Sequence, residues 1–214
     1  MSAWSELILI LVILTNLLLV GGNRLTGLIR FAAVQGLLAG LLPLLVHSHA
    51  ITARLIFLAA LAVALKGVAF PLLLGRALRE ADIRREVEPF VGSELSTFLG
   101  ISLLAFSFWL SEWLGIAQAG WLRLMLPVGF FTMMTGLFLI ISRHKALTQV
   151  LGYLVMENGI FLLGVALVGE VPFIVELGVL LDAFVAVFVM GIAIHHINRE
   201  FNHMDVHLMA RLKE

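Results

Sequence analysis

The sequence predicts an all-α integral membrane protein with about seven transmembrane helices, and three observations lead to this prediction. Hydrophobic residues make up 61% of the 214 residues, charged residues make up only 13%, and the mean hydropathy is +1.08. Apolar runs recur along the chain at close to the length that a bilayer requires, about 20 residues of helix. Lys and Arg gather in every second loop. A soluble domain of this length does not carry so much apolar surface.

The first three expected spans open the chain at residues 6–22, 30–46 and 55–75. The first is an unbroken apolar run with no basic residue before it, so we interpret it as a retained helix rather than a removable signal peptide. The third contains Lys66 and, five residues later, Pro71, which removes a backbone hydrogen bond and favours a kink.

The remaining expected spans are residues 95–115, 121–142, 149–168 and 172–195. The last two are joined by the short turn GEVP and are therefore expected to pack against each other in antiparallel fashion. Gly152, Gly159 and Gly164 within the sixth span would allow close helix approach or leave room for water.

The placement of the 14 Lys and Arg residues predicts the orientation. The loops after the first, third and fifth spans and the C-terminal tail hold eleven of them, the opposite side holds two, and Lys66 lies inside a span. Because cytoplasmic loops carry an excess of basic residues, the N-terminus is expected outside and the C-terminus in the cytoplasm. The eleven are Arg24, Arg30, Arg76, Arg79, Arg84, Arg85, Arg143, Lys145, Arg199, Arg211 and Lys213, and the two are Arg54 and Arg123.

A charged connector between the third and fourth spans divides the chain into two expected parts. Residues 1–93 form a three-helix membrane half with this cytoplasmic connector, and residues 94–214 form a four-helix half with a cytoplasmic tail. Mixed charge signs and Pro89 indicate that the connector is solvated.

Three ionisable residues stand near the middle of apolar spans: Lys66, Glu157 and Asp182. A charge at the bilayer centre costs about 2.5–3.5 kcal/mol on insertion scales, so such residues indicate an ion path by default. Counting to the nearest polar residues on each side places all three close to one central plane, where they would form a lateral proton or ion path. The alternative is a structural role, with buried hydrogen bonds for the acids and a counter-ion role for the lysine.

Glu176 lies near the outer end of the seventh span, either as an interface residue or as the outward branch of the same path. Nothing in the chain points to catalysis or to a metal site, since Cys is absent and no nucleophile or phosphate-binding motif is present. The net charge is zero, so a nucleic-acid partner is not expected.

Residues 143–189 resemble component E of the hydrogenase 4 membrane arm. The motifs that carry the resemblance are SRHKALTQVLGY leading into MENG, followed by VELGVLLDAFVAV. The likeness extends more faintly to LKGVAFPLL and to the tail DVHLMARLK.

Within the wider superfamily, residues 121–197 resemble the three-helix K subunit of respiratory complex I and the matching subunit of multisubunit cation/proton antiporters. Those subunits carry one acid in each of their last two helices, and the matching positions here are Glu157 and Asp182. Complex I has glutamate at the second position, where this chain has aspartate.

The resemblance implies a non-catalytic subunit of a redox-driven, ion-translocating assembly in the prokaryotic cytoplasmic membrane. Its expected partners are antiporter-like membrane subunits, the membrane anchor of the redox module and peripheral hydrogenase-like subunits. The nickel-iron centre and the iron-sulfur clusters are expected in those partners, with no cofactor bound by this chain. The alternatives are a subunit of a multisubunit antiporter, an autonomous proton or sodium carrier, and a passive membrane scaffold.

Overall fold

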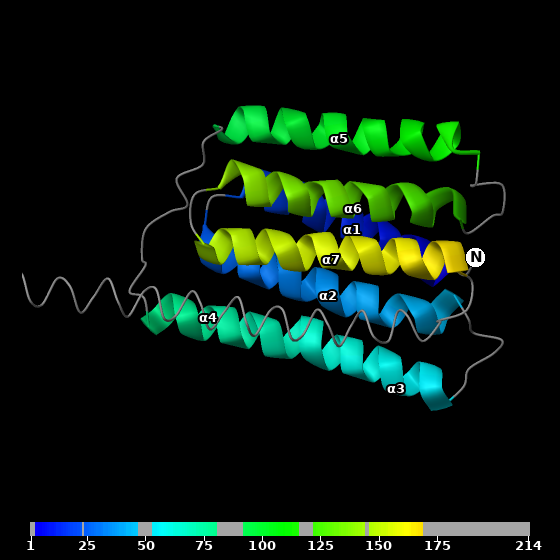
Figure 1. Ribbon diagram of the computed structural model, residues 1–214, viewed down its shortest axis with the longest axis horizontal. Helices are drawn as coiled ribbons and strands as arrows, with labels where there is room; N and C mark the ends of the chain where they lie inside the picture. The colour runs from blue at the N-terminus through cyan, green and yellow to red at the C-terminus, as the bar shows by residue number, and fades with distance from the viewer. Residues whose placement is uncertain are drawn as a thin grey trace, which may run out of the picture.

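All the elements that the computed structural model describes are helices, and they form one bundle (Figure 1). The structure describes residues 3–22, 24–46, 53–80, 92–115, 122–143 and 146–168. The helices are α1 (Ala3–Gly21), α2 (Leu25–Val46), α3 (Ala53–Ala62), the π-helix η1 (Val63–Ala69), α4 (Phe70–Glu80), α5 (Ser93–Trp113), α6 (Leu122–Ser142) and α7 (Ala146–Val168).

Because α3, η1 and α4 follow one another without a break, the described chain supplies six helices that are long and apolar enough to cross a membrane. The predicted all-α, multi-span class is therefore confirmed, and the chain is a multi-pass membrane protein. The predicted seventh span, residues 172–195, lies outside the described residues. Which end of the bundle faces the cytoplasm stays a prediction.

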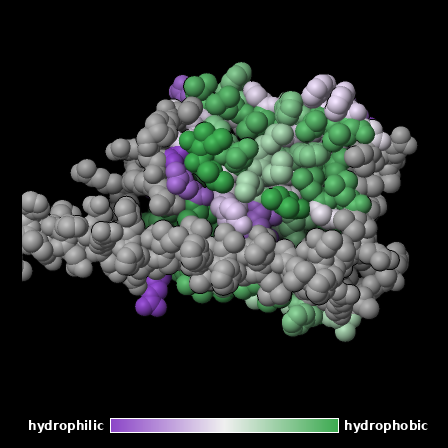
Figure 2. Space-filling model, viewed as in Figure 1, coloured by the Kyte–Doolittle hydropathy of each residue, from purple (hydrophilic) through white to green (hydrophobic). Residues whose placement is uncertain are grey.

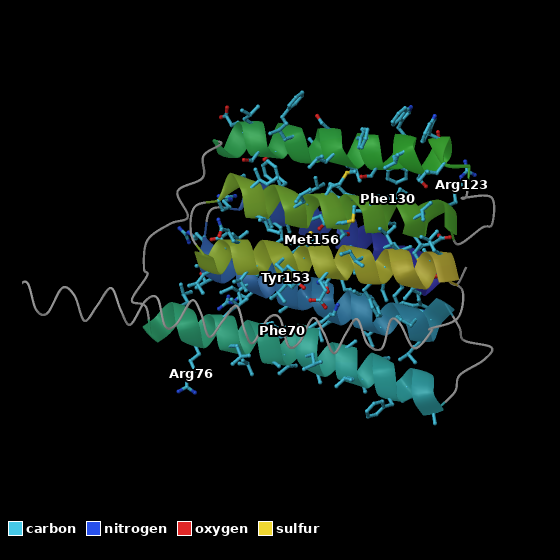
Figure 3. All side chains as sticks on the ribbon, in the orientation of Figure 1. Phe70, Arg76, Arg123, Phe130, Tyr153 and Met156 are labelled. Carbon is cyan, nitrogen blue, oxygen red and sulfur yellow. The ribbon has the colours of Figure 1, made fainter. Side chains whose placement is uncertain are left out.

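The helices alternate in direction, so that their ends gather at two opposite faces of the bundle (Figure 1). The end of α1, the start of α2, the end of α4 and the start of α5 lie at one face, together with the junction of α6 and α7. This face is the one that the count of basic residues assigns to the cytoplasm. Arg76 lies towards it and Arg123 lies at the opposite face (Figure 3).

The centre of the bundle consists of α1, α2, α6 and α7, while α5 and the α3–η1–α4 helix lie at its two edges (Figure 1). The α6 and α7 helices form the most extensive contact, and glycines allow it. A Cβ atom added at Gly159 would lie 2.9 Å from the carbonyl oxygen of Gly129, and one at Gly152 would lie 2.9 Å from that of Gly136. The prediction of close approach at these two α7 glycines is confirmed.

Buried apolar side chains form two clusters, one towards each face of the bundle. The first includes Leu28, Leu74 and Leu151, near the predicted cytoplasmic face, and the second includes Leu9 and Leu42, near the other face. Along α1, α2, α6 and α7, a buried polar residue stands between the members of the two clusters. The buried polar residues at this middle level include Asn16, Gln35, Lys66, Thr132, Glu157 and Asn158.

The outside of the bundle is apolar. Large hydrophobic side chains such as Phe57, Leu72 and Ile141 are well exposed, and hydrophobic residues cover most of the coloured surface of the face seen in Figure 2. A helix that is apolar on all sides suits a bilayer, because lipid tails cover the faces that protein does not.

Candidate functional site

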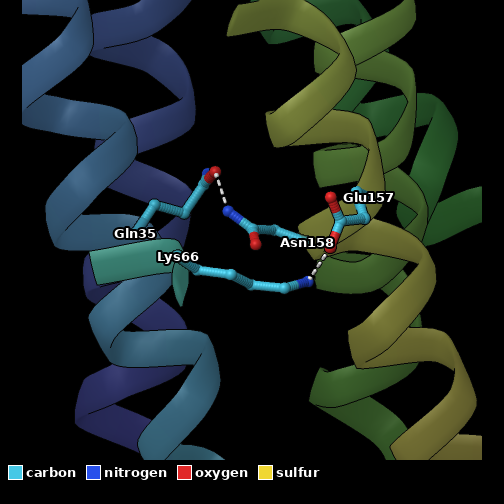
Figure 4. Close-up of polar contacts among 4 residues, drawn as sticks. All are labelled: Gln35, Lys66, Glu157 and Asn158. Carbon is cyan, nitrogen blue, oxygen red and sulfur yellow. Dashed lines mark hydrogen bonds and ion pairs between the residues drawn. The ribbon is translucent and has the colours of Figure 1, made fainter. Parts of the chain in front are cut away.

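Lys66 and Glu157 form an ion pair in the middle of the bundle (Figure 4). The Nζ atom of Lys66 lies 2.5 Å from Oε1 of Glu157, and each side chain is only 4% exposed. Glu157 is eleven residues from either end of α7, at the middle of the span. The two side chains are in direct contact, so Lys66 and Glu157 lie at the same depth of the bundle, as the sequence predicts.

The lysine reaches this position from a π-helical turn. The backbone N–H of Phe70 donates to the carbonyl oxygen of Leu65, the five-residue spacing that defines a π-helix. Pro71 follows at once and cannot donate a hydrogen bond. The interruption predicted at this point thus takes the form of the widened turn η1, and Lys66 is its buried residue.

Gly36 on α2 makes room for this turn. A Cβ atom at Gly36 would lie 2.9 Å from both Cβ and the carbonyl oxygen of Lys66, too close for any side chain. The missing side chain of Gly36 is what lets the backbone of η1 rest on α2.

An aromatic ring also contacts the ammonium group. Lys66 Nζ lies 5.0 Å from the centre of the Phe161 ring, one turn along α7 from Glu157. A desolvated cation over an aromatic face gains about 2 kcal/mol or more. The ammonium is thus held by a carboxylate and a ring that both belong to α7.

A chain of amide side chains continues the polar layer across the bundle. Asn158 donates to Oε1 of Gln35 at 3.3 Å, and Gln35 donates to Oδ1 of Asn16 at 2.7 Å. Asn16 donates to Oγ1 of Thr132 at 2.8 Å, and that hydroxyl donates to the carbonyl oxygen of Val128 at 2.7 Å. Every one of these polar side chains is at most 3% exposed.

The site predicted from the sequence did not include Asn16, Gln35, Thr132 and Asn158, because only ionisable residues were taken as candidates. The signal that would have found them is their position, since each stands inside an apolar run at a level similar to that of Lys66 or Glu157. Amide and hydroxyl side chains carry no charge near neutral pH, so Glu157 and Lys66 are the ionisable groups among these residues.

Asp182 and Glu176, the other two predicted path residues, lie outside the described residues, so their part in the site stays a prediction. Within the ranges that the structure describes, no group of three or more His, Cys, Asp or Glu residues is placed to hold a metal ion.

Arg143, predicted only as an orientation charge, has a structural role at the end of α6. Its side chain is 1% exposed, and Nη2 donates to the carbonyl oxygens of Val20 at 3.4 Å and Gly22 at 3.0 Å, at the C-terminal end of α1. A cation at a helix C-terminus satisfies carbonyl groups that lack helical partners. Burial lowers the pKa of the Arg143 guanidinium, which nevertheless keeps its proton, as arginine does in proteins.

Comparison with known proteins places the chain in a family. It is 30% identical over 203 residues to the uncharacterized protein Rv0085 of Mycobacterium tuberculosis, a match that covers 94% of this chain and 92% of that protein. The chain belongs to the same family as Rv0085. No protein-family model matches the chain, and neither does any solved structure.

A more distant match is to the family that the sequence resembles. The chain is 28% identical over 143 residues to hydrogenase-4 component E of Escherichia coli K12, which is 67% of this chain and 66% of that protein. The same values hold for hydrogenase-4 component E of Shigella flexneri. The resemblance stated from the sequence is thus confirmed as a distant relationship, while the likeness to complex I and to antiporter subunits stays a prediction.

Proposed function

We propose that this protein is a membrane subunit of a hydrogenase-type or complex I-like assembly, and that Glu157 is a station on a lateral proton or ion path through it. The observation that carries the proposal is the Lys66–Glu157 ion pair, which lies midway between the two apolar clusters. The distant relationship to hydrogenase-4 component E supplies the type of assembly.

The geometry supports a transport role because the carboxylate is stabilised without being fixed permanently in one state. The ammonium offsets the cost of a buried negative charge, and the carboxylate keeps its ability to accept a proton. If a proton binds to Glu157, the lysine loses its counter-charge and the neighbouring groups have reason to rearrange. An acid whose charge is coupled to a movable cation is suited to passing protons along a chain of such groups.

In the proposed assembly, the chain lies between the membrane anchor of the redox module and the antiporter-like subunits. Asp182 would extend the path from Glu157, and Glu176 would form its outward branch. The peripheral hydrogenase-like subunits would hold the nickel-iron centre and the iron-sulfur clusters, and this chain would bind no cofactor itself.

Two experiments test the proposal. Affinity purification of the tagged chain in mild detergent, followed by mass spectrometry, is expected to recover hydrogenase-like and antiporter-like subunits. In proteoliposomes that contain this complex, Glu157→Gln is expected to lower ion uptake per electron transferred while assembly persists. An active lone carrier would contradict membership in a complex, and normal uptake by the Gln variant would leave the ion pair with a scaffold role.

A further inference from the structure

A small cavity adjoins the ion pair on one side. Its volume is about 10 Å³, which is room for about one water molecule. Three polar side chains close one end of it, those of Lys66, Glu157 and Asn158. The rest of the wall is apolar and consists of Ile29, Ala32, Phe70, Pro71, Leu74, Leu151 and Leu154.

The polar end offers both donors and an acceptor. Asn158 is 3% exposed, and its Oδ1 atom accepts no hydrogen bond from any residue that the structure describes. Lys66 carries three N–H donors, and within the same part of the chain its polar partner is the Glu157 carboxylate, in a contact that lacks the angles of a hydrogen bond. A buried water needs two to four polar partners, and these atoms supply them.

The cavity lies on only one side of the pair. On α7 the lining residues run from Glu157 back to Leu151, six residues or about 9 Å towards the start of the helix. On the other edge the lining residues run from Lys66 forward to Leu74, eight residues or about 12 Å towards the end of α4. Both directions lead to the predicted cytoplasmic face, and Ile29, four residues into α2, lines the same side.

The opposite side of the pair is closed by packing. There, Asn158 bonds to Gln35, and the backbone of η1 rests on Gly36 without room for even a Cβ atom. Among the described residues, the cavity thus approaches the pair through the wall between α2, α4 and α7.

We propose that this cavity is a water site that delivers protons from the cytoplasmic side to Glu157. The water accepts a hydrogen bond from Lys66 Nζ and donates one to Asn158 Oδ1. A proton that arrives on this water passes to the Glu157 carboxylate, which becomes neutral, and the water is regenerated.

This inference rests on the proposed transport function, and its first test does not require activity. The chain contains no cysteine, so a single introduced thiol has no background within it. Leu74→Cys lines the cavity, whereas Leu72→Cys, two residues away and 65% exposed on the outside of the bundle, is the matched control. Silver ion, supplied as the nitrate in chloride-free buffer, is added to one side of membrane vesicles that hold the assembled complex. The remaining free thiol on the tagged chain is then measured by maleimide labelling after denaturation.

Silver added on the cytoplasmic side is expected to protect the thiol of Leu74→Cys from maleimide, with no protection from the other side. The thiol of Leu72→Cys, which faces lipid, is expected to label fully in both cases. Protection of Leu74→Cys only from the outside, or from neither side, overturns the inference, because the cavity then does not open to the cytoplasm.

A second test fills the cavity. Ala32→Leu adds bulk to its wall, and Ala33→Leu makes the same change at the next residue of α2, which does not line the cavity. The first variant is expected to lose most of its coupled proton uptake in sodium-free buffer, and the second to keep it. If the complex with Ala32→Leu does not assemble, silver protection of Leu74→Cys alone tests whether the cavity opens to the cytoplasm. Wild-type uptake in Ala32→Leu, or uptake that requires Na⁺, overturns the inference.

The two proposals fail in different ways. Normal uptake in Glu157→Gln removes the transport function itself. A defect in Glu157→Gln, combined with no access of silver to Leu74→Cys from the cytoplasm, removes only the water site.

Discussion

The Lys66–Glu157 ion pair joins the N-terminal and C-terminal parts of the chain, so removing one partner tests both packing and function. Lys66→Met and Glu157→Gln nearly preserve side-chain volume, and each leaves one buried charge without its partner. Removal of one partner from a buried pair costs about 3–5 kcal/mol.

The double variant separates charge from shape. With both charges removed, two neutral side chains of similar volume face each other, and such replacements of buried pairs are often close to neutral. We therefore expect each single variant to lose about 3 kcal/mol, which lowers the midpoint of thermal unfolding by roughly 6–12 °C for a chain of this size. The double variant is expected to recover most of that loss.

The assay is thermal unfolding of the purified complex in detergent, followed through a fluorescent tag on this chain. Glu112→Gln, which removes an exposed carboxylate at the end of α5, is the control and should leave the midpoint unchanged. If the two single losses simply add in the double variant, Lys66 and Glu157 do not interact, and the reasoning fails. Ion uptake is expected to stay impaired in the double variant even as its stability returns, because the titrating group is missing.

Three further predictions concern the packing around the pair. Gly36→Ala is expected to destabilise the protein, because the new Cβ would meet the Lys66 backbone, whereas Gly75→Ala meets nothing within 4 Å and is expected to stabilise α4 by up to about 1 kcal/mol. Gln35→Leu removes two hydrogen bonds of the amide chain and is expected to cost about 1–3 kcal/mol for each buried group left without a partner. Arg143→Gln is expected to lower the unfolding midpoint, while the same change at the exposed Arg30 should not.

The same unfolding assay checks all three, and each has a result that contradicts it. Equal midpoints for Gly36→Ala and Gly75→Ala would mean that η1 does not rest on α2. A Gln35→Leu variant as stable as the wild type would show that the amide chain contributes nothing. Loss of stability in Arg30→Gln equal to that in Arg143→Gln would assign the effect to net charge rather than to the carbonyl groups of Val20 and Gly22.

The sequence predicted the positions of the six described spans, but it did not predict the residues at which their helices begin and end. Residues 121–142 were predicted and α6 covers Leu122–Ser142, because hydropathy identifies the segment that lies in hydrocarbon. The α2 helix instead starts at Leu25, five residues before the predicted span, and α4 continues to Glu80. Helices extend into the polar interface, where exposed residues such as Arg30 end the apolar run without ending the helix.

The depth of the site was also predictable, but its neighbours were not. Counting residues along a helix gives the level of Lys66 and of Glu157, because each residue rises by a fixed amount. Contact also requires that both side chains point towards the same interface, which depends on rotation about each helix. The π-turn shifts that rotation for Lys66, and Pro71 is the one sign of it in the sequence. The amide chain depends on four such rotations at once, which no single run of sequence reveals.

The positive charge that compensates Glu157 comes from Lys66, in the other part of the chain. Glu157 belongs to the part of the chain that resembles a three-helix K subunit, yet the ammonium that compensates it comes from residues 1–93. The division at residue 93 stays a prediction, but the ion pair crosses it, and α1 and α2 contact α6 and α7 on both sides of the polar layer. A fragment of residues 94–214 alone would carry a carboxylate at mid-span with no Lys66 beside it. The N-terminal helices therefore act as the electrostatic partner of the proposed path as well as its packing support.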